Sequence, residues 1–159
     1  MNEKLVVFVD AGHGGIDPKM GKYTTSGKRA YHAGLPMHDG KGNYYEGFEN
    51  RIIADAVCAA LAANGIQSIR VHHPFADSQD GGSAELQRRA ALVNDYLAAG
   101  YTGYLHSFHS NAIGGDAAKM EQTQGFCVFT TVGQTHSDKL AEKLWDYTKI
   151  AFPEWNVRS

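Results

Sequence analysis

Apolar residues along the chain alternate between short β-branched runs and longer segments with helical spacing. The first run, residues 5–9, ends at the glycine-rich stretch DAGHGG and therefore predicts a buried strand that leads into a tight turn. Residues 46–63 (EGFENRIIADAVCAALAA) predict a helix that stops at Asn64-Gly65. Its expected inward-facing stripe consists of Ile53, Val57 and Leu61.

The rest of the chain continues this alternation. Residues 66–71 (IQSIRV), 102–109 (TGYLHSFH) and 125–131 (GFCVFTT) predict three further strands. Residues 84–98 and 137–152 predict two further helices, the second with Ser137 as its N-cap. Their expected inward-facing residues are Leu86, Ala90, Val93 and Leu97 in the first, and Leu140, Leu144 and Ile150 in the second. Repeated strand–helix units predict an α/β fold with a mostly parallel, twisted sheet and helices on both faces.

One long segment, residues 16–45, interrupts the alternation. It has no helical period and is rich in glycine, lysine, tyrosine and histidine. Irregular segments of this length are uncommon in compact domains unless they are functional. We therefore expect residues 16–45 to form an irregular loop that walls a cleft.

Composition limits the class of protein. A chain of 159 residues suits one domain, so we expect a single domain over residues 1–159. The net charge is −2 and no basic run is present, which gives no support to nucleic-acid binding. No apolar segment is long enough to span a bilayer and no signal peptide is recognisable, so we expect cytoplasmic synthesis without membrane insertion. Cys58 and Cys127 stand in apolar segments and are expected to be buried free thiols.

Two histidines stand where predicted strands end, His13 in DAGHGG and His109 in LHSFH. Ligands gather at the carboxyl ends of strands in open α/β sheets. A catalytic zinc ion takes three protein ligands, commonly two histidines and a carboxylate, and keeps one open position. Glu46, in the first turn of the predicted helix, is the natural third ligand, with Glu49 as its rival. Spacing alone leaves the alternative that each histidine is satisfied by ordinary hydrogen bonds.

Four ordered motifs carry a family resemblance: DAGHGG, EGFENR, LQRRAALVN and SFHSNA. Over about residues 6–156, the chain resembles the zinc-dependent N-acetylmuramoyl-L-alanine amidases, cell-wall hydrolases that include many phage endolysins. The resemblance implies a Zn²⁺ site with His13, Glu46 and His109 as ligands. It favours Glu46 over Glu49 because the family has an asparagine four residues after the ligand, where this chain has Asn50, one helical turn away.

Further residues are expected around this site. A metal-bound histidine normally donates its second N–H to an oxygen, so Asp10 is expected to orient a ligand or order the turn, with a backbone cap as the alternative. Ser107 and Asn111 flank the third ligand and are expected to contact backbone or substrate. The segment TSGKRAYHAG resembles one found in phage-type members. Its Lys28 and Arg29 either pair with carboxylates of a peptide stem or remain solvated.

The other histidines are expected to be structural. Side chains alternate along a strand, so His106 and His109 should point to opposite faces unless the strand has already ended. His106 stands where the family usually has an aliphatic residue, which predicts either a satisfied core histidine or a partner for a group that the sequence does not reveal. The remaining five are expected at the surface: His32, His38, His72, His73 and His136.

The general base of the family is not found in the sequence, so the catalytic residue is unknown. The resemblance implies a glutamate on a late strand, in a Val-x-x-Glu-like context, after the helix that ends near Phe152. We expect no such strand before Ser159, and hence a chain that lacks the C-terminal strand and helix of the family. Glu154 is the nearest remaining carboxylate, but it follows a helix end beside Pro153 and is a poor candidate.

Two functional hypotheses follow. The first is a zinc hydrolase of phage or prophage endolysin type that cleaves the amide bond between N-acetylmuramic acid and L-alanine in peptidoglycan. The second is a zinc-containing module that binds the cell wall or has a regulatory role, and that is catalytically silent because the general base is missing. A zinc peptidase of related fold, acting on peptides without a sugar, is a third reading. Peptidoglycan is the expected partner in the first two.

Overall fold

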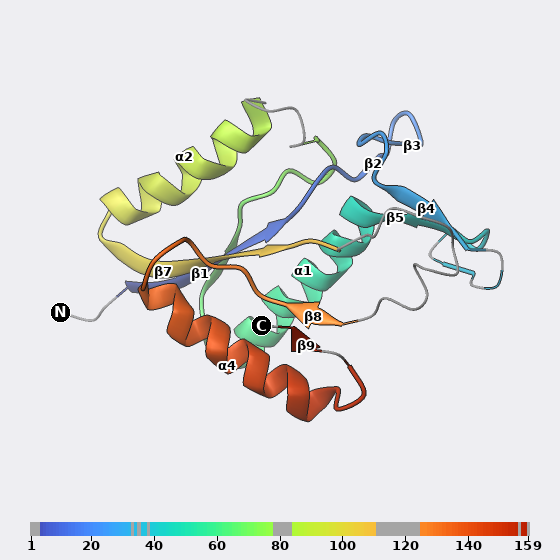
Figure 1. Cartoon of the computed structure of the whole chain (residues 1–159). Helices are drawn as coiled ribbons and strands as arrows, with labels where there is room; N and C mark the ends of the chain where they lie inside the picture. The colour runs from blue at the N-terminus through green and yellow to red at the C-terminus, as the bar shows by residue number, and fades with distance from the viewer. Residues whose placement is uncertain are drawn as a thin grey trace. The chain divides into compact units, whose positions relative to one another are not determined.

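The computed structural model describes residues 4–32, 34, 36–37, 39–77, 84–110, 125–155 and 157–158. The chain forms two compact units, Met1–Ser110 and Asn111–Ser159, and each is described by itself (Figure 1). The expectation of a single domain stays a prediction.

The first unit is built on a parallel sheet of three strands, which confirms the α/β class. Its strands are β1 (Lys4–Ala11), β6 (Ser68–Arg70) and β7 (Tyr101–Phe108), in the order β6-β1-β7 (Figure 1). The central strand β1 pairs with β7 along its whole length, from Lys4 opposite Tyr101 to Ala11 opposite Phe108. Both of these strands therefore end at the same edge of the sheet, where the site lies.

Helices cover both faces of this sheet, as expected. Val9 and Ala11 of β1 pack with Ala54 and Cys58 of α1 (Glu46–Ala63). The alternate residues of β1 belong to the opposite face, where a second core cluster includes residues of α2 (Ala84–Ala98). Its members are Val6, Phe8 and Val71, with Leu92, Val93 and Tyr96 packed against them. Figure 1 shows α1 and α2 on opposite sides of the sheet.

Both helices have the predicted bounds, but their buried faces differ from the predicted stripes. In α1, Val57 and Leu61 pack against the core, whereas Ile53 is 45% exposed. The buried positions of α1 are Glu46, Gly47, Asn50, Arg51, Ala54 and Cys58. Polar and small residues take this face because α1 serves the functional site at one end and packs closely on the sheet elsewhere.

The prediction for α2 was wrong at most positions. Leu86 and Leu97 are 49% and 45% exposed and Ala90 is also exposed, while Val93 alone of the predicted four packs on the core. Arg89 is the buried residue of this helix. A stripe chosen by hydrophobicity misses this face because a charged side chain occupies its centre.

Residues 16–45 contain two small hairpins, so the prediction of an irregular loop was wrong in part. The first joins β2 (Ile16–Asp17) to β3 (Lys22–Tyr23), and the second joins β4 (Arg29–Tyr31) to β5 (Asn43–Tyr45), both antiparallel. Strand β5 runs directly into α1, with Tyr45 at the N-cap position. The second hairpin therefore fixes where Glu46 begins the helix.

The second unit contains α4 (His136–Ala151), β8 (Phe126–Cys127) and β9 (Val157–Arg158). The expected fourth strand is confined to β8, which pairs in parallel with β9. A two-residue strand, β9, follows the helix; it carries no glutamate, so it is not the Val-x-x-Glu-like strand that the family resemblance implies.

The start of α4 also differs from the prediction. Thr135, not Ser137, is the N-cap, and its backbone N–H donates to the Asp138 carboxylate at 2.6 Å. Leu140 and Leu144 are half-buried as expected, whereas Ile150 is 75% exposed. An acid three residues into the helix favours the earlier start, because its carboxylate satisfies a backbone donor at the helix end.

Two expectations about chemistry outside the site can be compared with the structure. Cys58 is a buried free cysteine, as expected, whereas Cys127 is only half-buried. No helix in the described part of the chain combines the length and apolar character needed to cross a bilayer.

Candidate metal centre

The three predicted metal ligands come together at the carboxyl edge of the sheet. His13 lies in the turn after β1, Glu46 in the first turn of α1, and His109 directly after β7. One candidate ligand atom from each residue lies within 4.8 Å of the others. Oε1 of Glu46 is 3.1 Å from Nε2 of His13 and 3.4 Å from Nδ1 of His109. These three residues are called the metal triad below.

The triad fits a zinc ion in both spacing and chemistry. Ligand atoms on a tetrahedral zinc with bonds of about 2.0–2.1 Å lie about 3.3–3.4 Å from each other. The two measured separations, 3.1 and 3.4 Å, are close to this value. The other ring nitrogen of His13, Nδ1, has no hydrogen-bond partner among the described residues, but it is not the atom that these separations place at the ion. Two imidazoles and one carboxylate are also a usual donor set for zinc.

The electrostatics of the triad favour the ligating forms of its residues. Burial lowers the pKa of His13, although the neighbouring Glu46 carboxylate partly opposes this shift. Burial raises the pKa of Glu46, but hydrogen bonds from His109 and from the Ser110 N–H outweigh it and leave this pKa below its usual value. Because metal binding needs neutral imidazole and ionised carboxylate, both shifts favour binding near neutral pH.

The turn that carries His13 is held by two buried arginines, which we call the arginine clamp. His13 has a positive φ of 64°, an unusual backbone conformation for a residue with a side chain. Its carbonyl oxygen accepts hydrogen bonds from Nη2 of Arg51 at 3.1 Å and from Nη2 of Arg89 at 3.3 Å. Two cations on one carbonyl fix the peptide plane from which the ligand projects.

Each arginine of the clamp also ties the turn to a different helix. Arg89 of α2 donates to the Ala11 carbonyl at 2.8 Å and to the Asp10 carboxylate at 2.8 Å. Arg51 of α1 donates to the Gly47 carbonyl at 2.6 Å. Burial, together with the charge of Arg89, lowers the pKa of Arg51 to about 10, so it stays charged at neutral pH.

Sequence reasoning missed both members of the clamp. Arg51 and Arg89 stand inside the quoted motifs EGFENR and LQRRAALVN, but charged residues on helices are usually solvated, so nothing in the motifs marks these two as buried. The available signal was spacing: Arg89 lies four residues after Glu85 and three before Leu92, on the face that packs against the sheet.

Close packing at Gly12 and Gly47 leaves no room for larger side chains beside the triad. A Cβ on Gly12 would lie 2.1 Å from the His109 ring, and a Cβ on Gly47 would lie 1.9 Å from the Gly14 carbonyl oxygen. The Gly14 N–H donates to the buried hydroxyl of Thr25 at 2.8 Å. The glycines of DAGHGG and EGFENR are therefore required by close approach of the turn, α1 and the third ligand.

Two of the predicted neighbours contact the site directly. Asn50 is fully buried, and its amide group lies 3.4 Å from both the Gly12 carbonyl and the Ser110 hydroxyl. The backbone carbonyl of Lys28 accepts the Glu46 N–H at 3.1 Å, and the Lys28 charge contributes to lowering the pKa of His13. Lys28 therefore lies close to the triad, whereas the exposed Arg29 lines the pocket described below.

Other predicted neighbours act on the turn or lie elsewhere. Asp10 accepts hydrogen bonds from Arg89 at 2.8 Å and from the Ser107 hydroxyl at 2.6 Å. Asp10 and Ser107 therefore help to order the turn. No described contact joins Asp10 to a ring nitrogen of the triad. Asn111 lies outside the described residues. Glu154 is exposed in the second unit, between α4 and β9.

Three of the histidines predicted at the surface are half-buried instead: His32, His72 and His73. His72 is half-buried and its Nδ1 accepts the Ala11 N–H at 3.1 Å; burial, with a contribution from Arg51, lowers its pKa to about 4. His73 is half-buried and accepts the N–H groups of Phe75 and Ala76. Both residues shape the loop after β6, where the sequence gives no periodic signal.

The remaining histidines are placed as follows. His136 is exposed and His32 is half-buried, while His38 lies outside the described residues. His106 is half-buried, its ring lies 4.4 Å from that of Phe108, and burial lowers its pKa. His109 follows the end of β7, so the alternation of the strand does not fix its direction.

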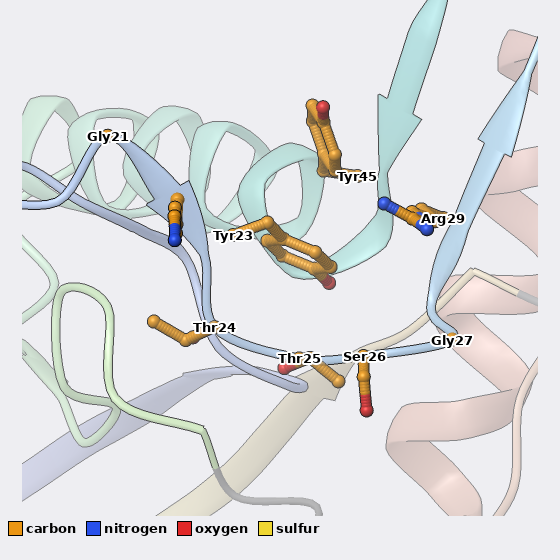
Figure 2. Close-up of a pocket in the computed structure, with 9 residues that line it drawn as sticks. Gly21, Tyr23, Thr24, Thr25, Ser26, Gly27, Arg29 and Tyr45 are labelled. Carbon is orange, nitrogen blue, oxygen red and sulfur yellow. The ribbon is translucent and has the colours of Figure 1, made fainter.

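A pocket opens in the segment between the turn and α1. It has a volume of about 410 Å³ and is lined by residues 21–27 with Arg29 and Tyr45. Figure 2 shows Tyr23 between Tyr45 and the run from Thr24 to Ser26, with Arg29 at one side. We call it the tyrosine pocket.

Neither the curated proteins nor the solved structures give a match. The model of one family, described as N-acetylmuramoyl-L-alanine amidase, matches residues 7–154, a range that includes the triad and the arginine clamp. The match covers most of the chain, and the chain therefore belongs to the N-acetylmuramoyl-L-alanine amidase family, a family of peptidoglycan amidases.

Proposed function

We propose that the chain is a zinc-dependent amidase that cleaves the bond between N-acetylmuramic acid and the L-alanine of the peptide stem. The observation that supports this most strongly is the convergence of His13, Glu46 and His109 within 4.8 Å at the edge of a parallel sheet. Family membership supports the reaction class, and the donor set supports the choice of metal.

The residues of the triad have distinct parts in this proposal. The side chains of His13 and Glu46 are 9% and 8% exposed, whereas that of His109 is 48% exposed. A substrate would therefore approach from the His109 side. The buried pair would hold the metal, and the Ser110 N–H donates to Oε1 of Glu46 at 3.0 Å and keeps this carboxylate in place. Zinc in such a site supplies Lewis-acid chemistry, which polarises a carbonyl and lowers the pKa of water.

A second function is favoured by one observation about acids near the turn. Glu46 serves as a ligand in this proposal, and Asp10 is already bonded to Arg89 and Ser107. Neither is free to act as a general base. A catalytically silent, zinc-containing module that binds the wall or regulates is therefore the alternative function.

Mass spectrometry of digested peptidoglycan separates these two functions. The zinc-loaded chain is incubated with purified peptidoglycan beside the His109→Ala variant. Release of stem peptides with a new N-terminal alanine by the unaltered chain alone is the expected result. Tight zinc binding without release would support the silent module and contradict the amidase.

We also propose an endolysin-like role, as in phage or prophage lysis. Its support is the resemblance of residues 25–34 to a segment of phage-type members. The chain added to bacteria with permeabilised membranes should lower their optical density, while intact bacteria resist it. Equal lysis of both would contradict a role that depends on access through the membrane.

A further inference from the structure

The tyrosine pocket lies next to the metal triad. Its wall segment is joined to the triad by backbone contacts: Gly47 donates its N–H to the Tyr23 hydroxyl at 2.9 Å, and Glu46 donates its N–H to the Lys28 carbonyl at 3.1 Å. Tyr45, which lines the pocket, directly precedes Glu46. The charge of Glu46 also acts on Tyr23 and helps to raise its pKa, although burial contributes more. These contacts hold the wall of the pocket beside the residues that carry the triad.

The lining of the pocket is cationic. Lys22 and Arg29 contribute two positive charges, and no aspartate or glutamate is among the lining residues. The acids that act on Tyr23, Glu46 and Asp77, lie outside the lining. The pocket thus favours an anionic group over a neutral or cationic one.

The two cations are available for a ligand. The side chains of Lys22 and Arg29 are exposed and make no ion pair or hydrogen bond with any residue that the structure describes. The contrast with Arg89 is direct, since that guanidinium is committed to two carboxylates and two backbone carbonyls. A guanidinium with free N–H groups presents the planar fork that binds a carboxylate.

Fixed aromatic rings form another part of the lining. The rings of Tyr23 and Tyr45 lie 5.0 Å apart at 45°, and the Tyr23 hydroxyl is anchored by the Gly47 N–H. Tyr45 is paired in register with Arg29 across the second hairpin. The aliphatic parts of a peptide can pack on these rings while a carboxylate meets the cations.

We propose that the tyrosine pocket is a subsite for a carboxylate of the peptidoglycan stem peptide, bound by Arg29 and Lys22. This inference rests on the proposed function, because it takes peptidoglycan as the substrate. Within that polymer, the carboxyl of the lactyl group is consumed in the scissile amide, so the free carboxylates belong to the stem peptide. The subsite would let the enzyme select stems by their charge.

Direct binding tests this subsite without relying on turnover. The probe is the synthetic tripeptide L-Ala-γ-D-Glu-L-Lys, used with free carboxylates and with all carboxylates converted to carboxamides. Calorimetry measures its binding to the full chain, to the Lys22→Gln/Arg29→Gln variant and to a charge-matched control, Lys19→Gln/Lys41→Gln. Lys19 and Lys41 are exposed and stand outside the pocket.

The expected result is that the free-acid peptide binds about tenfold more weakly to the pocket variant than to the unaltered chain, the scale of charge-assisted contacts at a partly exposed site. The control should bind the peptide as the unaltered chain does, and the carboxamide peptide should bind all three proteins equally weakly. Equal binding of acid and carboxamide, no binding of the acid, or equal losses in both variants would overturn the subsite. A peptide-free glycan fragment whose binding falls in the pocket variant would reassign the pocket to sugar.

The proposed function can fail separately. If the chain releases nothing from peptidoglycan yet binds the free-acid peptide through Lys22 and Arg29, the subsite stands and the amidase activity does not. If the chain releases stem peptides with the same kcat/KM in the pocket variant and on carboxamide-bearing walls, the amidase stands and the subsite does not.

Discussion

The turn after β1 and the tyrosine pocket each have an arginine near the metal triad, but one is buried and the other is exposed. In the turn, Arg89 is buried and fully bonded, and its work is to position backbone. In the pocket, Arg29 is exposed and has no side-chain partner among the described residues. The comparison teaches that burial decides the role of a charge: a buried arginine fixes geometry, and an exposed one is left to recognise a ligand.

The largest effect should come from breaking the clamp. Arg89→Met leaves Asp10 and Glu85 without their buried partner, so the free energy of unfolding should fall by about 3–5 kcal/mol. Chemical denaturation measures this loss. The matched control is Arg70→Met: Arg70 pairs with Asp55 at 2.7 Å, but on an exposed surface, and should cost below about 1 kcal/mol. Similar losses in the two variants would show that burial does not set the difference.

A smaller loss is expected where the turn meets α1. A Cβ on Gly47 would lie 1.9 Å from the Gly14 carbonyl oxygen, so Gly47→Ala must displace backbone and should cost about 1–3 kcal/mol. It should also weaken zinc binding, because Glu46 is adjacent. Gly34→Ala is the control, since its Cβ would find its nearest atom in the His32 ring at 3.7 Å. Thermal unfolding of both variants checks the prediction. A Gly47→Ala variant with the same melting temperature as the unaltered chain would contradict it.

The turn also predicts a pH dependence of stability. Burial lowers the pKa of His72 to about 4 in the folded protein, whereas the same side chain keeps a pKa of about 6.5 in the unfolded chain. Because the folded pKa is depressed, stability is fully present above pH 6.5 and falls as the pH drops from 6.5 to 4, by about 1–3 kcal/mol. His72→Gln retains an acceptor for the Ala11 N–H but does not titrate, so its denaturation midpoint should depend less on pH in this range. Parallel pH profiles for the two proteins would refute the assignment.

The smallest effect on stability is expected in the pocket. The Lys22→Gln/Arg29→Gln variant removes two exposed charges without partners in the described part of the chain, so its unfolding free energy should stay within about 0.5 kcal/mol of the original. Denaturant titration measures it. A loss comparable to that of Arg89→Met would mean that these cations are structural, which would erase the contrast between the two regions.

Much of the framework followed from local pattern. The bounds of α1 and α2, the β-branched run of β1 and the glycine turn are all signalled by neighbouring residues, and the parallel α/β sheet follows from their alternation. The three residues of the triad follow from quoted motifs. The long-range partners did not follow, because no local signal states that Arg89 bonds the carbonyl of a residue 76 positions earlier.

The errors have a common physical cause. Hydrophobic stripes assume that inward-facing positions are apolar, so they failed in α1 and α2, where Asn50, Arg51 and Arg89 are buried for the sake of the site. The half-buried His72 and His73 were missed because loops carry no period. The hairpins of residues 16–45 are too short for an alternating pattern to be visible.

Zinc titration of the purified chain tests the central claim most directly. The unaltered chain should bind one equivalent of zinc in competition with a chromophoric chelator, and His13→Ala and Glu46→Gln should each bind at least about tenfold more weakly. Glu49→Gln is the matched control and should bind zinc as the unaltered chain does, because Glu46 is the carboxylate in the triad. Unchanged zinc affinity in Glu46→Gln, or its loss in Glu49→Gln, would contradict the assignment of the metal centre.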